Sequence, residues 1–282
     1  MNSWILYIVL FLFFSCIFTQ GYKLLTKKLI SEGSLTVILQ FIGSIFILII
    51  SLFFKYKFPS NIKIYLLLFI SIIFYAISDR LNTKIRKDVD TSSFSILKQF
   101  STIFLVIIGI IFLKEKIKIT TILGTIFIIS SNVFLLINKG KLKLNKTVIF
   151  SILANLSFAI AISLDINISN SFNLPIYISI ILFGSSTLIF IFEKIKLKDL
   201  KKEYLTSNKK ILFITSLSWG LSSFCQLRAY TLGKVTIIAP VTASVIILNA
   251  MIEYVFFKEK TNLLKKIICG ITIIISVILI GL

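Results

Sequence analysis

The chain has 282 residues, of which 57% are hydrophobic and only 15% are charged, and its mean hydropathy is +1.01. A soluble domain of this length needs far more polar surface, so the composition excludes a water-soluble globular protein. The formal net charge of +20 also does not indicate nucleic-acid binding, because the Lys and Arg residues lie mainly in short segments between apolar runs, where they meet membrane lipid headgroups.

Apolar stretches long enough to cross a bilayer follow one another from end to end. The first lacks the basic region and cleavage site of a signal peptide, so it is predicted to be a span. The longest connection, residues 193–210, is predicted to be a solvated basic loop. The fold class is therefore an all-α integral membrane protein in the cell membrane, with ten transmembrane helices at residues 3–22, 35–54, 62–82, 92–113, 119–138, 147–168, 175–192, 211–231, 235–257 and 264–282.

The chain repeats itself at about half its length. The phrases "IIFLKEKIK" (110–118) and "YVFFKEKTN" (254–262) place Glu115 and Glu259 at equivalent points, an offset of 259 minus 115, or 144 residues. The same offset aligns polar with polar and aromatic with aromatic residues on one face of a helix. These pairs are Ser71 with Thr215, Tyr75 with Trp219, Ser78 with Ser222, and Asn82 with Gln226.

The repeat predicts two five-helix halves, residues 1–138 and 139–282. Because five is odd, the second half enters the membrane from the opposite side, which gives an inverted-topology repeat. Such repeats are typical of transporters, whose substrate site lies near the midplane at the repeat interface. A monomer suffices for function, since the two halves already supply that interface.

Two stretches resemble the EamA-type domain of the drug/metabolite transporter superfamily. Residues 227–260, "LRAYTLGKVTIIAPVTASVIILNAMIEYVFFKEK", carry Pro240 and an exit Glu, Glu259, at the spacing of that domain. Residues 90–116, "DTSSFSILKQFSTIFLVIIGIIFLKEK", fit through Glu115 but have no Pro. The resemblance covers essentially the whole chain as two tandem EamA-like domains.

This resemblance implies a membrane transporter that exports or exchanges small polar metabolites, often amino acids. The family usually has Gly before the exit Glu, where this chain has Lys114 and Lys258. The resemblance also implies that both termini are cytoplasmic. The distribution of Lys and Arg, which is densest after odd-numbered spans, predicts instead that both termini lie outside, so orientation and direction of transport stay open.

Lys98 is the outlier among the intramembrane residues, since it lies about two turns inside the fourth span. Polar residues in spans usually face a bundle interior or a water-filled cavity. We expect Lys98, Thr102 on the same face and the adjacent Gln99 to bind substrate. A purely structural ion pair of Lys98 is the alternative.

The ninth span presents Thr242, Asn249 and Glu253 on one face, which we expect to line the same cavity. The fourth and ninth spans run in opposite directions, so Lys98 and Glu253 should lie at similar depth. We predict that they pair, or that a zwitterionic substrate bridges them.

The eighth and third spans supply the other expected contacts to substrate. Ser222 and Gln226 lie on the repeated polar face. Tyr75 and Trp219 are expected to form an aromatic pair across the repeat axis, in a cavity suited to an aromatic or cationic solute. Anchoring at the membrane interface is the alternative for these two rings.

Four further charged residues are candidates for gating or for structural ion pairs. Asp165 and Arg228 approach the same leaflet near the ends of the sixth and eighth spans. Asp79 and Arg80 are adjacent near the end of the third span and need not pair with each other. For both sets, charges that simply face water at the interface are the alternative.

Nothing in the sequence indicates an enzyme or a cofactor. There is no His, no nucleophile with a base, and no Gly-rich phosphate loop before a helix. The three Cys residues lie in apolar runs, so neither a disulfide nor a metal site is expected. We predict a secondary transporter of a small molecule, coupled to a gradient or to exchange. A flippase of lipids or lipid-linked sugars and a non-transporting structural membrane protein are the alternatives.

Overall fold

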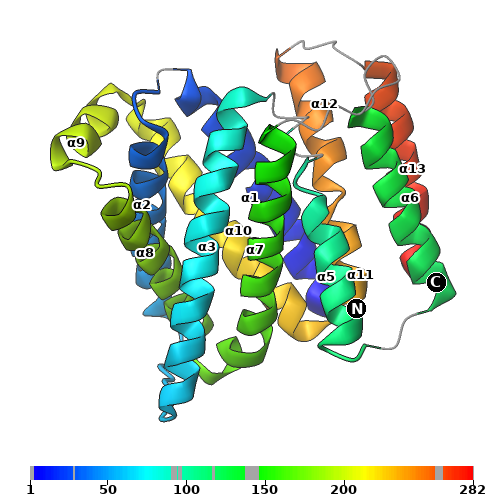
Figure 1. Ribbon diagram of the computed structural model, residues 1–282, viewed down its shortest axis with the longest axis horizontal. Coiled ribbons are helices and arrows are strands. Elements are labelled where there is room, and N and C mark those ends of the chain that lie inside the picture. The colour runs from blue at the N-terminus through cyan, green and yellow to red at the C-terminus, as the bar shows by residue number, and fades with distance from the viewer. Residues whose placement is uncertain are drawn as a thin grey trace.

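The computed structural model describes residues 3–27, 29–89, 94, 97–115, 118–136, 146–257 and 263–281, and Glu259 and Lys258 lie outside these ranges. Every regular element of the described residues is helical, as predicted. Most helices stand side by side, whereas α9 lies to one side of one end of α2 (Figure 1). The elements are α1 (Ser3–Thr26), α2 (Glu32–Ser51), α3 (Ile62–Asp88), α5 (Phe100–Ile111), α6 (Ile119–Leu136), α7 (Lys146–Ile168), η1 (Ser169–Ser171), α8 (Leu174–Phe192), α9 (Leu197–Thr206), α10 (Lys209–Leu232), α11 (Val235–Thr242), α12 (Val245–Phe257) and α13 (Leu263–Gly281).

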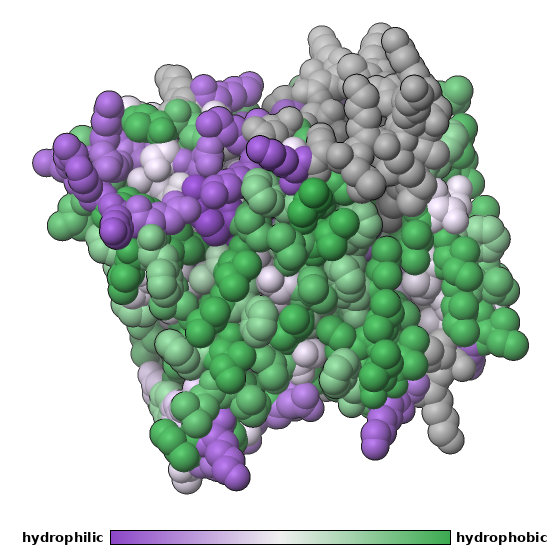
Figure 2. Space-filling view, in the orientation of Figure 1, coloured by the Kyte–Doolittle hydropathy of each residue, from purple (hydrophilic) through white to green (hydrophobic). Residues whose placement is uncertain are grey.

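The surface is that of a protein immersed in lipid. Figure 2 shows an apolar band around the middle of the visible face, with hydrophilic side chains above and below it. Large apolar side chains such as Phe69 and Ile122 are about half exposed within the fold. Among the described residues, six helical segments are long and apolar enough to cross a membrane. They are Ser3–Thr26, Glu32–Ser51, Ile62–Lys87, Lys146–Ser171, Leu174–Phe192 and Val235–Phe256.

The helices associate in defined pairs. The most extensive contacts join α1 to α10, α3 to α7, α2 to α8 and α6 to α13. Where α2 crosses α10, a Cβ on Gly43 would lie only 2.8 Å from the backbone oxygen of Ser216, so this close approach requires glycine. The Asn residues that precede α3, α8 and α10 cap the helices by accepting hydrogen bonds from backbone N–H groups in the first turn.

The prediction that residues 193–210 form a solvated loop is wrong. They contain α9, whose Leu200 packs against apolar side chains of the bundle. Glu203 of α9 is fully buried, and its Oε2 accepts hydrogen bonds from the backbone N–H groups of Ile30 (3.0 Å) and Ser31 (2.9 Å). The basic composition suggested a loop, but an apolar face and one buried carboxylate dock the segment on the start of α2.

Two spans also differ from their predicted ranges. The third helix continues from residue 82 to Asp88, which brings Arg86 into the bundle. The ninth span is divided into α11 and α12 by a turn at Ala243 and Ser244. Pro240 lies inside α11, where it lacks the N–H that would donate to the carbonyl of Thr236, so it weakens this short helix close to the turn.

The start of α11 is held by the exit Glu of the first half. The Glu115 carboxylate accepts hydrogen bonds from the backbone N–H groups of Val235 (2.8 Å) and Thr236 (3.0 Å), and from the Thr236 hydroxyl (2.7 Å). A carboxylate at a helix N-terminus satisfies free N–H groups and complements the helix dipole. The repeated Glu therefore does more than mark the membrane exit, because it joins the first half to the second.

Lys114 has a left-handed backbone conformation, with φ 52°. A Gly at this position would adopt the positive φ without the steric cost that a residue with a Cβ atom has. We expect Lys114→Gly to raise the free energy of unfolding by about 0.5 to 1 kcal/mol, measured by SDS titration and circular dichroism. Lys196→Gly is the control, because Lys196 is extended and gains no relief. Equal stabilisation by both variants would contradict the argument.

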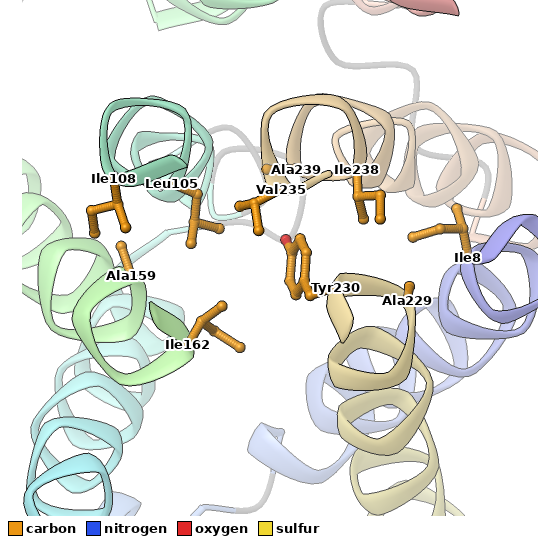
Figure 3. Close-up of a cluster of buried hydrophobic side chains, with 10 residues drawn as sticks. All are labelled: Ile8, Leu105, Ile108, Ala159, Ile162, Ala229, Tyr230, Val235, Ile238 and Ala239. Carbon is orange, nitrogen blue, oxygen red and sulfur yellow. The ribbon is translucent and has the colours of Figure 1, made fainter. Parts of the chain in front are cut away.

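An apolar cluster fills the region where α1, α5, α7, α10 and α11 meet (Figure 3). Ile8 and Val235 place it near the beginnings of α1 and α11. The cluster therefore closes the bundle at the end opposite to the last turn of α1. Its buried members are Ile8, Leu105, Ile108, Ala159, Ile162, Ala229, Tyr230, Val235, Ile238 and Ala239.

Candidate functional site

A polar central cavity of about 80 Å³ lies among α1, α3, α7, α8 and α10. A smaller lobe of about 30 Å³ extends it toward α5, α11 and α12 and shares several lining residues with it. Together they bring residues from both halves of the chain to one place. The predicted site residues in these linings are Tyr75, Trp219, Ser222, Gln226, Lys98, Gln99, Thr102, Thr242 and Asn249.

The central cavity continues toward the end of the bundle at which α1 and α3 end. This vestibule of about 140 Å³ is lined by Thr19, Tyr22, Lys23, Thr26, Arg86, Val89 and Phe94. Arg86 and Phe94 line the central cavity, the lobe and the vestibule alike. At the other end, Ile162 and Tyr230 of the apolar cluster form part of the cavity wall. Among the described residues, the polar space therefore extends toward the end of the bundle where α1 and α3 end and meets the apolar cluster at the other.

Among the described residues, three charged side chains line the central cavity: Asp79, Arg86 and Lys98. Lys98 lies in a turn just before α5, and its Nζ is 5.8 Å from the centre of the Phe158 ring. Asp79 lies within electrostatic range of both cations. Its Oδ2 accepts a hydrogen bond from Gln40 Nε2 at 2.5 Å.

The predicted pairing of Lys98 with Glu253 is wrong. The buried Glu253 carboxylate lies 3.4 Å from Nζ of Lys23, a residue of α1, and it is absent from the lining of the central cavity. The prediction compared depth along two spans, but α1 packs against α12 and brings its own lysine closer. Because Lys23 lines the vestibule, its neighbour Glu253 lies beside the vestibule and not in the central cavity.

Exchanging the charges of Lys23 and Glu253 tests whether the two side chains are neighbours. We expect Lys23→Glu with Glu253→Lys to recover about 1 kcal/mol of the stability that the single variants lose, because neighbouring charges couple. Unfolding in SDS, followed by circular dichroism, measures it. Lys98→Glu with Glu253→Lys is the matched control and should recover nothing. Recovery in the control pair alone would restore the original pairing.

Asp165 does not pair with Arg228 either. It is fully buried in α7, and its carboxyl oxygens accept hydrogen bonds from Ser71 (2.5 Å), Tyr75 (2.7 Å) and Tyr177 (2.6 Å). Three hydroxyl donors, two from α3 and one from α8, thus replace a cation as its partners. Asp165 joins α3, α7 and α8, and it orients the Tyr75 ring at the cavity wall.

Asp79 and Arg80 have separate roles, as expected of adjacent helical residues. Asp79 faces the central cavity. Arg80 forms ion pairs with Glu193 and with Glu32, whose Oε2 lies 3.4 Å from Arg80 Nη1. Lys87 adds a second cation to Glu32 at 2.8 Å. Arg80 therefore links α2, α3 and the end of α8 in a network of partly exposed charges.

Tyr75 and Trp219 both line the central cavity but do not stack on each other. The Trp219 ring packs against Phe18, with 4.8 Å between ring centres. Tyr75 meets the edge of Phe158 at 6.1 Å. Two aromatic contacts, each between different helices, thus flank the polar space instead of a single pair across the repeat axis.

Arg86 is the functional candidate that the sequence analysis missed. Its guanidinium carbon lies 3.8 Å from the ring centre of Phe94, 4.9 Å from that of Tyr22 and 5.1 Å from that of Phe18. The signal was present, because Arg86 continues the polar face of the third span by one further turn after Asn82. It was missed because a basic residue near a predicted span end resembles an interfacial anchor.

Part of the chain matches a known protein family. Residues 2–137 match the model of the EamA-like transporter family. The first half of the chain is therefore similar to the EamA-like transporter family. That similarity, together with the apolar helices, indicates a multi-pass membrane protein. No curated protein matches the chain significantly.

A solved structure is similar to this chain over almost its whole length. This crystal structure, described only as that of a protein, has a TM-score of 0.67 and 11% sequence identity. The alignment covers 96% of this chain and 95% of the other. At such low identity the similarity concerns the fold alone.

Proposed function

We propose that the protein is a secondary transporter of a small polar metabolite, such as an amino acid, in the cell membrane. Substrate binds in the central cavity between the halves 1–138 and 139–282, and a monomer carries out alternating access. One observation carries this proposal. A polar cavity with three charged side chains lies inside an apolar bundle, where such groups are costly and usually functional.

The helix pairs support the two-half organisation. Under the offset of 144, α1 corresponds to α7 and α3 to α10, so the α1–α10 contact is the counterpart of the α3–α7 contact. The α2–α8 and α6–α13 pairs each map onto themselves. At the level of residues, Asp165 contacts Ser71, and the equivalent Gly21 packs closely against Thr215. Both relations are those expected of two halves related by a twofold axis, whether the repeat is inverted or parallel.

Interrupted helices at the cavity also support transport. A turn at Lys98 and Gln99 precedes α5, and a turn at Ala243 and Ser244 precedes α12. The two turns lie at nearly equivalent positions of the two halves. Transporters commonly build their midplane sites from such discontinuous helices, because the exposed backbone and freed side chains can face the substrate.

The shape of the cavity favours a small solute over a lipid. Apolar grooves of about 570 and 650 Å³ lie on the outside, but their linings share no described residue with the central cavity. A flippase would need a lateral path between such a groove and the polar site. The cavity instead extends lengthwise to the vestibule, which suits a water-soluble molecule.

Thermal unfolding in detergent, against amino acids, amines, organic acids and nucleosides, tests the proposal. A substrate at about 100 times its dissociation constant should stabilise the protein by about 2.7 kcal/mol. The same compound should cross the membrane of reconstituted liposomes. Lys98→Met and Trp219→Ala should abolish both effects, whereas the exposed Lys84→Gln should not. If no compound of the panel binds or crosses, a lipid substrate or a purely structural role replaces the proposal.

A further inference from the structure

The charges that line the central cavity and its lobe do not balance. Arg86 and Lys98 are cationic, and Asp79 is the one carboxylate in the described linings. Asp79 is also engaged elsewhere, since its Oδ2 accepts hydrogen bonds from Gln40 (2.5 Å) and Ser185 (3.5 Å). The site is therefore left with an excess positive charge in a largely apolar surrounding, where a counter-charge is strongly favoured.

Arg86 keeps its hydrogen-bonding capacity unused. Within the described part of the chain, its guanidinium makes no hydrogen bond or ion pair and is surrounded by the rings of Phe18, Tyr22 and Phe94. Aromatic faces stabilise the positive charge but cannot act as directional acceptors for five N–H donors. A guanidinium with unused N–H donors is complementary to a carboxylate, because its planar fork of donors fits the two carboxylate oxygens in a bidentate manner.

Lys98 supplies a second cation next to this donor fork. Its Nζ lies 5.8 Å from the centre of the Phe158 ring, and the residue lines both the cavity and the lobe. It lies in the turn before α5, so it is held at an interrupted helix and not on a surface-facing turn. Two cations, Arg86 of α3 and Lys98 of the turn before α5, thus line one small polar space.

We propose that this space is a binding site for a small solute that carries a carboxylate, held by Arg86 and assisted by Lys98. The inference rests on the proposed function and narrows its substrate class to anionic or zwitterionic compounds. The volume of about 80 Å³ restricts the bound part to a compact group.

Fluorescence quenching tests the charge of the site and needs no identified substrate. The chain has two Trp residues, so Trp4→Phe leaves Trp219, in the cavity wall, as the reporter. At constant ionic strength, the ratio of iodide to caesium quenching should be about threefold higher for Trp219 than for free N-acetyltryptophanamide, because caesium is by itself the weaker quencher of indole. Arg86→Gln should remove most of this difference and leave quenching by neutral acrylamide unchanged. Lys98→Met is a second variant, should Arg86→Gln not fold.

Lys84→Gln is the matched control, because it removes a positive charge from the same helix at an exposed position. Its iodide quenching should equal that of the parent. An iodide-to-caesium ratio in the parent equal to that of free N-acetyltryptophanamide would overturn the proposal. So would absence of all quenching, or a preference for iodide that survives both Arg86→Gln and Lys98→Met.

Matched ligands then identify the anionic group. Acetate and L-leucine should protect Trp219 from iodide, whereas L-leucinamide, which lacks the carboxylate, should not. Protection by phosphate but by neither carboxylate would overturn the assignment of a carboxylate. Flux of the same compounds into liposomes separates the two proposals. Binding without flux would refute transport and keep the site, whereas flux of L-leucinamide unaffected by Arg86→Gln would refute the site and keep transport.

Discussion

Replacing Asp165 with alanine is expected to lower the free energy of unfolding by about 4 kcal/mol. The variant removes three hydrogen bonds at once and leaves the hydroxyls of Ser71, Tyr75 and Tyr177 without their acceptor in the bundle interior. Each buried, unsatisfied polar group costs about 1 to 3 kcal/mol. SDS titration of the purified protein, followed by circular dichroism, measures the loss.

Two related variants separate geometry from charge. Asp165→Asn keeps an oxygen for Ser71 and Tyr177, and the Tyr75 hydroxyl can turn to accept from its amide, so we expect a loss of only about 1 kcal/mol. Asp199→Ala removes a carboxylate from α9 and should change stability by less than about 0.5 kcal/mol. If Asp165→Asn were as damaging as Asp165→Ala, charge and not hydrogen bonding would explain the site.

Glu115→Ala is expected to cost about 3 kcal/mol, measured in the same way. The backbone N–H groups of Val235 and Thr236 would lose their acceptor, and both residues are about 1% exposed, so little water can replace it. The contact cannot readily rearrange, because a Cβ on the neighbouring Gly109 would already lie 2.8 Å from Thr236. The variant should therefore weaken the contact between the end of α5 and the start of α11.

A double-mutant cycle isolates the cap. Thr236→Val alone removes the hydroxyl donor and should cost about 1 kcal/mol. In the Glu115→Ala background the same change should cost almost nothing, because the bond is already absent. Additive losses would show that Glu115 acts on stability through something other than the start of α11.

The sequence predicted well what depends on local pattern. Helix positions follow from apolar runs, and the helical period identified the polar face that carries Tyr75, Trp219 and Ser222 to the central cavity. Lys98 could be recognised because a charge deep in an apolar run is costly unless it faces a polar interior. These inferences need only neighbours along the chain.

What could not be predicted depends on neighbours in space. The choice of Lys23 over Lys98 as the partner of Glu253 depends on the packing of α1 beside α12. The Tyr177 donor to Asp165 comes from another helix, and nothing in the pattern of α8 marks it. Glu203 looked like a surface residue until its two N–H partners were located in space.

The environment of Asp165 has a consequence for how the chain is made. Because synthesis proceeds from the N-terminus, α3 is in place before α7 emerges from the ribosome, and with it the Ser71 and Tyr75 hydroxyls. When α7 enters the bilayer, two hydroxyl donors to the carboxyl group of Asp165 are therefore already present in α3. The last donor, Tyr177, arrives with the next helix and completes the set. The order of helices therefore spares α7 a period of exposure to lipid with its carboxyl group unsatisfied.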